Sequence, residues 1–134
     1  MYRGKVMKKR LLSGFLWVLM LIVSGTNLWA DNTRIAVVSQ GNTPDAVVSP
    51  VAARGLYFLI FDVQGTFIEA LKNPYRDAGR NASEQVVADL SNRGVTTLIA
   101  GNFGNKMTAA MTARRIRYVE FQGTAADAVR KAVP

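Results

Sequence analysis

The chain has 134 residues and contains neither cysteine nor histidine, which excludes disulfides, Ser-His and Cys-His catalysis and ordinary zinc sites. Its formal net charge of +8 comes mostly from residues 1–30, which hold five of the 17 basic residues and no acid. Residues 31–134 carry 12 basic and nine acidic residues, a net charge of only +3, so the overall charge does not indicate a nucleic-acid-binding domain.

Residues 1–30 have the pattern of a secretory signal. A basic start, MYRGKVMKKR, precedes the apolar LLSGFLWVLMLIV, and SGTNLWA then ends in the small residue Ala30. The apolar centre has 13 residues, fewer than the roughly 20 that cross a bilayer as a helix. We therefore predict a cleaved signal peptide over residues 1–30 and a periplasmic or otherwise extracytoplasmic domain over 31–134. An uncleaved inner-membrane anchor is the alternative, with membrane contact through residues 1–30 alone.

Three strands are expected in the first half of this domain. RIAVVS, residues 34–39, is short, apolar and rich in branched side chains, which is typical of a strand covered on both faces. A polar loop over 41–55 leads to the strongest strand pattern, LYFLIFDV at 56–63. Gln64-Gly65 then predicts a hairpin turn into a strand over 66–71.

Helices and strands alternate in the second half. Asn81 and Glu84 form a capping pair for a helix that ends at Gly94, and VTTLIA at 95–100 is a further buried strand. A second helix is expected after a Gly-Asn loop, with Asn105 as its cap and two methionines on its core face. A strand over 116–121 and a last helix opened by Thr124 complete the chain.

The element order βββαβαβα restricts the topology. The hairpin makes strand two antiparallel to its neighbours, and right-handed crossovers then place strand four beside strand one and strand five outside it. We predict an α/β fold, a three-layer α/β/α sandwich with a five-stranded mixed sheet of order 3-2-1-4-5. Its topological switch point lies between strands one and four, where ligands of open α/β sheets bind at the carboxyl ends.

The loop after strand four is the best candidate for a binding site. Gly101 and Gly104 let backbone amides approach a ligand, and the following helix N-terminus favours an anion. Lys106 is unfavourable for the helix dipole unless an anion compensates it. Ser39 and Gly41 face this loop from strand one. The alternative is a plain strand-to-helix turn without a ligand.

Four stretches resemble, in order and spacing, the dinitrogenase iron-molybdenum cofactor biosynthesis family of the NifX and NifB C-terminal type. They are RIAVVS, SPVAARGLYFLIFD, KNPYRDAG and GVTTLIAGNFGNKM, and the resemblance covers Arg34 to about Val133. It implies a ribonuclease H-like fold and a non-catalytic carrier or accessory protein that binds iron-molybdenum cofactor or an iron-sulfur precursor cluster. The positions that match its motifs are Ser49, Arg54, Tyr57, Phe58, Asn73-Pro74, Gly94-Val95, Gly101, Asn102 and Gly104.

The chain departs from this family where metal ligands are expected. Val51 stands where many members have histidine, Ala52-Ala53 replaces Phe-Gly, and Tyr75–Arg80 replaces a histidine- and glycine-rich stretch. We therefore predict no metal ligands, but an anionic ligand or a cluster held without direct coordination by arginine, lysine and loop amides. The predicted ligand-binding residues are Ser39, Gly41, Ser49, Arg54, Gly101, Asn102, Gly104, Asn105 and Lys106.

The sequence also bears on two other function classes. A nuclease or phosphotransferase needs clustered acids for magnesium, and the first strand has none, so we predict no enzymatic activity and no nucleic-acid partner. The alternative function is an envelope interaction module without a small ligand, which docks a protein through strand five or the face of Arg114 and Arg117.

Overall fold

The computed structural model describes residues 33–133 of the chain. The predicted signal peptide lies outside these residues. Within the range 33–133, no helix has the length and hydrophobicity needed to span a membrane.

The five strands form one mixed sheet. They are β1 (Arg34–Ser39), β2 (Tyr57–Asp62), β3 (Phe67–Lys72), β4 (Val95–Ala100) and β5 (Arg117–Glu120). Their order is β3-β2-β1-β4-β5, with β2 antiparallel to both neighbours and β1 parallel to β4. The predicted strand order and directions are therefore confirmed.

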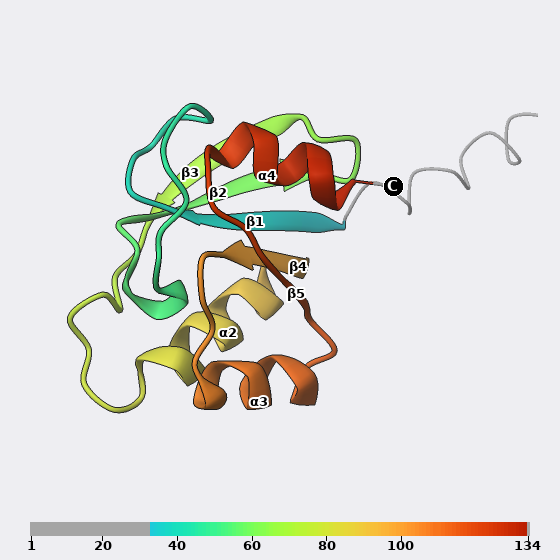
Figure 1. Cartoon of the computed structure of the whole chain (residues 1–134). Helices are drawn as coiled ribbons and strands as arrows, with labels where there is room; N and C mark the ends of the chain where they lie inside the picture. The colour runs from blue at the N-terminus through green and yellow to red at the C-terminus, as the bar shows by residue number, and fades with distance from the viewer. Residues whose placement is uncertain (1–32, 134) are drawn as a thin grey trace, which may run out of the picture. The chain divides into compact units, whose positions relative to one another are not determined.

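Helices cover both faces of the sheet, as predicted (Figure 1). One face carries α4 (Ala125–Ala132), while α2 (Ala82–Asn92) and α3 (Asn105–Ala113) lie on the other. A short 3-10 turn, η2 (Ala52–Arg54), contacts α2. The architecture is thus the three-layer sandwich that the sequence predicts.

The sheet separates two hydrophobic cores. Adjacent residues of β1 point to opposite faces, so Val37 packs under α4 and Val38 packs under α2 and α3, both fully buried. This two-sided burial explains why RIAVVS is almost wholly apolar. Each such side chain contributes about 1.5–3 kcal/mol relative to an exposed one.

The helix caps follow the sequence in part. Thr124 caps α4 by accepting the backbone N–H of Asp127 at 3.3 Å, as predicted. Asn81 is the N-cap of α2, but its side chain makes no capping hydrogen bond. The prediction for α3 is wrong by one residue, because Gly104 is the N-cap and Asn105 is already helical.

Candidate functional site

The chain itself fills the crevice between β1 and β4. The backbone N–H of Ser49 donates to the carbonyl oxygen of Val38 at 2.7 Å, and that of Gly101 donates to Ser49 at 2.8 Å. One turn later, the N–H of Ala52 donates to Asn102 at 3.1 Å. The segment 47–52 therefore bridges the carboxyl ends of both strands.

This bridge accounts for the glycine at position 101. A Cβ there would lie 2.8 Å from the Cα of Pro50 and 3.0 Å from the carbonyl oxygen of Ser49, closer than real Cβ atoms approach backbone. Close approach of the backbone was the predicted role of Gly101, but the approaching group is this chain's own segment 47–52.

The predicted residues from β1 and its loop lie inside the fold. Ser39 is fully buried, and its hydroxyl donates to the carbonyl oxygen of Gly41 at 2.6 Å. Ser49 is 2% exposed, and its hydroxyl donates to Val51 at 2.9 Å. As placed, both hydroxyls serve the chain's own turns, so ligand contact at these residues stays a prediction that requires segment 47–52 to move.

Arg54 holds the loop between β3 and α2. Its Nη1 donates to the carbonyl oxygens of Arg76 at 2.6 Å and Ala78 at 2.7 Å, while the side chain is exposed. The guanidinium thus joins η2 to the loop over residues 73–81. Arg80 lies at the end of this loop, just before α2.

Asn73 fixes the start of the same loop and was not predicted to have this role. Its side chain is buried, and Nδ2 donates to the carbonyl oxygens of Ala53 at 3.1 Å and Gly55 at 3.0 Å. Oδ1 accepts the backbone N–H of Tyr75 at 2.9 Å. The two bonds from Nδ2 tie the loop to η2 and to the residue after it, and the third shapes the loop itself. The Asn73-Pro74 pair was the available signal, but it had been noted as a match to the family's motif, without a role for the asparagine side chain.

The start of α3 is open to an anion. Gly104 offers no capping side chain, and the first turn contains no acid. The first hydrogen bond of the helix runs from the N–H of Thr108 to the carbonyl oxygen of Gly104. The preceding N–H groups therefore have no acceptor within the helix. Across residues 33–133, the side chains of Asn102, Asn105 and Lys106 make no hydrogen bond or ion pair.

Lys106 shares a cleft with the start of α2. Figure 1 shows that α2 and α3 begin at the same end of the sandwich, so their positive dipole ends lie on one side. A cleft of about 390 Å³ runs from there along α3 to Ala113, with the cations Arg80 and Lys106 and one acid, Glu84. We call it the Arg80–Lys106 cleft. Its lining residues are Arg80, Asn81, Ser83, Glu84, Lys106, Ala109, Ala110 and Ala113.

A second cleft at this end, of about 380 Å³, contains Gly101 and Asn102 but no charged side chain. It lies beside segment 47–50 and the loop after β5, lined by Val47, Val48, Pro50, Gly101, Asn102, Phe121, Gln122 and Gly123. The predicted site is therefore divided: Lys106 faces one cleft, while Gly101 and Asn102 face another.

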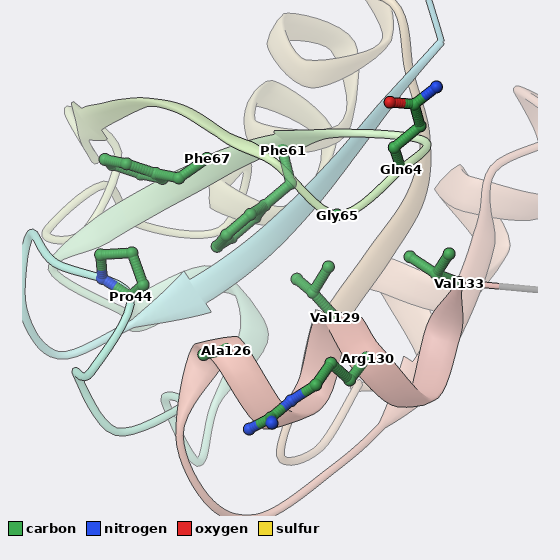
Figure 2. Close-up of a pocket in the computed structure, with 9 residues that line it drawn as sticks. All are labelled: Pro44, Phe61, Gln64, Gly65, Phe67, Ala126, Val129, Arg130 and Val133. Atoms are coloured by element: carbon green, nitrogen blue, oxygen red, sulfur yellow. The ribbon is translucent and has the colours of Figure 1, made fainter.

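A third cavity, of about 560 Å³, contains none of the predicted residues (Figure 2). It lies on the α4 side of the sheet, with Phe61 and Phe67 from the hairpin and Val129 from the helix. Its single charged side chain, Arg130, is paired with Asp127 on the helix surface. This pocket is mostly apolar and separate from the α2 and α3 starts.

The donor set does not fit direct coordination of a metal. The whole chain lacks cysteine and histidine, and residues 33–133 contain no group of three or more acidic side chains placed to hold an ion. Thiolates and imidazoles normally ligate iron-sulfur clusters. The site can instead offer positive charge, amide N–H groups and neutral amide side chains.

Comparisons with known proteins agree with this fold. The apo form of the orange protein from Desulfovibrio gigas has a TM-score of 0.70 and 25% identity, over 75% of this chain and 86% of that chain. A putative NifB protein from Thermotoga, described as belonging to the DUF35 family, has a TM-score of 0.65 and 31% identity, with the same two coverages. No curated protein matches the chain. Residues 33–133 match the family described as dinitrogenase iron-molybdenum cofactor, and the chain therefore belongs to this family.

Proposed function

We propose that the protein is a non-catalytic accessory or carrier protein that binds an anionic metal cluster. Membership of the dinitrogenase iron-molybdenum cofactor family supports this, as does similarity to a putative NifB protein. Iron-molybdenum cofactor itself or an iron-sulfur precursor is the expected cargo. The cluster is substrate here, carried and handed on, rather than a resident cofactor.

The cluster is held by charge and hydrogen bonds, because no thiolate or imidazole is available to coordinate it. Such contacts leave the metal's own ligands in place. They are also strongest when the partner is an anion, since charge-assisted hydrogen bonds are about twice as strong as neutral ones.

The arrangement of Lys106 and Arg80 carries the proposal. Lys106 lies in the first turn of α3, where a cation opposes the helix dipole and no acid of the same turn compensates it. Arg80 brings a second cation to the same cleft from the start of α2. An anion in the Arg80–Lys106 cleft meets both cations and the free amides of α3. Its negative charge compensates Lys106, whose positive charge is otherwise unfavourable at the start of a helix.

The other predicted residues take distinct parts in this proposal. Asn105, the first residue of α3, supplies an orienting hydrogen bond, and Asn102 supplies one from the neighbouring cleft that it lines. Arg54 acts indirectly, because it fixes the loop that ends at Arg80. The buried turns that contain Ser39, Gly41 and Ser49 support the loop after β4 from inside the fold.

The test uses tetrathiomolybdate as an anionic metal-sulfur probe. The full chain is mixed with it anaerobically, and molybdenum that co-elutes with protein on gel filtration is measured. We expect Arg80→Gln with Lys106→Gln to weaken binding at least about tenfold, and rising salt to weaken wild-type binding, because the contacts are electrostatic. Arg93→Gln, at the far end of α2, is the matched control. Salt-independent binding that the double variant leaves unchanged contradicts the proposal.

We further propose that residues 1–30 export the protein and are removed after Ala30. This rests on the basic, apolar and small-residue pattern of the segment. The intact mass of protein from the extracytoplasmic fraction tests it, with Asp31 expected as the first residue. Full-length protein in the membrane fraction supports the anchored alternative, and full-length protein in the cytoplasm contradicts export.

A further inference from the structure

The outer edge of β5 is open. β5 pairs with β4 on one side only, from Arg117 opposite Thr97 to Glu120 opposite Ala100. The backbone N–H of Phe121 donates to Ala100 at 3.0 Å. Because these groups alternate along a strand, those of Tyr118 and Glu120 point away from the sheet. They form a template for another extended chain.

The two edges of the sheet differ in how well they are protected against pairing with another strand. At the opposite edge, the pairing of β2 with β3 shifts between Ile60 and Phe61, so that Ile68 of β3 has no partner. Such a bulge discourages further pairing at an edge. The register of β4 with β5 runs without a shift, and β5 contains no proline. The β5 edge is therefore the one suited to accept a strand.

Cations surround this edge. Arg114, Arg115 and Arg117 are exposed, and within residues 33–133 none of them has an ion pair. Lys131 of α4 lies over the ring of Phe121, 5.6 Å from its centroid. The one acid on the strand is Glu120. An added chain thus meets positive charge at the start of β5 and again just after its end.

The charges also lie on both faces of the sheet. Arg117 shares a face with Val119, which packs in the core under α4, whereas Arg114 lies at the C-terminal end of α3 on the opposite face. Successive side chains of an extended segment alternate between these faces. Acidic residues at neighbouring positions of the segment therefore each find an arginine.

Tyr118 supplies a fixed apolar surface within the edge. It is 44% exposed, and its ring lies 5.3 Å from that of Phe103, which is nearly buried beside α3. The contact holds the tyrosine ring in place without burying it. A flat aromatic ring beside free backbone groups suits a peptide that is partly apolar.

We propose that the β5 edge docks an extended acidic segment of a partner protein, which adds a sixth strand to the sheet. Backbone hydrogen bonds give affinity in this mode, and the flanking cations select acidic side chains. A peptide fits better than a nucleic acid, because the free N–H and C=O groups match another backbone and Glu120 interrupts the basic surface. The proposal does not depend on cluster binding, since it uses the other end of α3.

A synthetic peptide tests the proposal directly. The probe is a fluorescent peptide of about eight residues in which pairs of neighbouring glutamates are separated by valine and threonine, and its control has lysine for glutamate. Anisotropy is measured with the full chain, with Arg114→Glu/Arg117→Glu, and with Lys72→Glu at the opposite edge. We expect the double variant to weaken binding at least about tenfold and Lys72→Glu to change it less than about twofold. Failure of the glutamate peptide to bind, or equal binding of the lysine peptide, overturns the proposal.

Amide hydrogen exchange distinguishes strand addition from simple charge attraction. With the wild-type chain, the peptide is expected to slow exchange of the Tyr118 and Glu120 amides several-fold and to leave Phe121, already bonded to Ala100, unchanged. Binding without this protection overturns strand addition. A single-stranded oligonucleotide and phosphatidylglycerol vesicles are measured in parallel. If binding of the oligonucleotide or of the vesicles depends on Arg114 and Arg117 more strongly than peptide binding does, the surface is not a peptide-docking edge.

Discussion

The backbone N–H of Gly101 donates to the carbonyl oxygen of Ser49 over 2.8 Å, which joins the loop after β4 to the segment before η2. Ser49 in turn donates to Val38 of β1. A crevice that open α/β sheets leave for ligands is thereby closed by the chain itself. The surface that stays open to a ligand lies instead at the starts of α2 and α3.

Replacing Gly101 tests this closure. Gly101→Ala places a Cβ against Pro50, and we expect the free energy of unfolding in urea to fall by about 1–3 kcal/mol, the usual effect of overpacking. Gly79→Ala is the control, because no atom lies within 4 Å of its added Cβ. Its effect is expected to stay within about 0.5 kcal/mol. Equal effects of both changes would show that packing at 101 is unimportant.

Capping α3 is expected to separate stability from binding. Gly104→Asp supplies the missing cap in a compatible extended backbone, φ −72° and ψ 164°, and should raise the free energy of unfolding by about 0.5–1 kcal/mol. The same carboxylate repels an anion, so tetrathiomolybdate binding should fall. Gly104→Asn caps without charge and should keep more of the binding. Equal loss with both variants argues against an electrostatic site at this helix start.

Removing the Asn73 side chain is expected to release the loop before α2. Asn73→Ala leaves the carbonyl oxygens of Ala53 and Gly55 without their donors, and we expect a loss of about 1–3 kcal/mol in urea denaturation. Asn73→Asp should cost more, because a carboxylate then faces both oxygens. Asn81→Ala, which removes a side chain without a capping bond, is expected to change stability little. A large effect at Asn81 contradicts this distinction.

Arg54 is expected to control the mobility of the loop more than global stability. Arg54→Ala removes the bonds to Arg76 and Ala78, so amide exchange over residues 75–80 should become faster, while Arg54→Lys keeps part of the effect. Arg76→Ala should leave exchange unchanged, since only the backbone carbonyl of Arg76 is used. Unchanged exchange in Arg54→Ala would remove the indirect role that we assign to this guanidinium.

The strands were predictable because a strand that is buried on both faces is an almost continuous apolar run in the sequence. The predicted bounds of β1 and β4 agree with the structure at both ends, since each is an apolar run that stops at a polar residue or glycine. The cap of α3 was misplaced because asparagine is the commoner cap, while the backbone made Gly104 the extended residue. Local preference does not decide between two adjacent positions.

The site was less predictable than the fold. Gly101 and Lys106 are five residues apart, yet they line different clefts, because Phe103 between them turns inward and packs beside α3. An aromatic residue in a Gly-Asn loop was the available sign of such an anchor. The roles of Asn73 and Arg54 depend on partners about 20 residues away, which spacing along the chain does not reveal.

The sequence by itself determined where the strands and helices lie and that thiol and imidazole ligands are absent, because periodicity and composition are local properties. The hairpin and the right-handed crossover rule then determined the strand order. Only the tertiary structure decided which backbone groups remain free. Segment 47–52 fills the crevice between β1 and β4, and the starts of α2 and α3 bring Arg80 beside Lys106. Hydrogen bonds between distant segments settle these points, since a polar group paired within the fold is no longer available to a ligand.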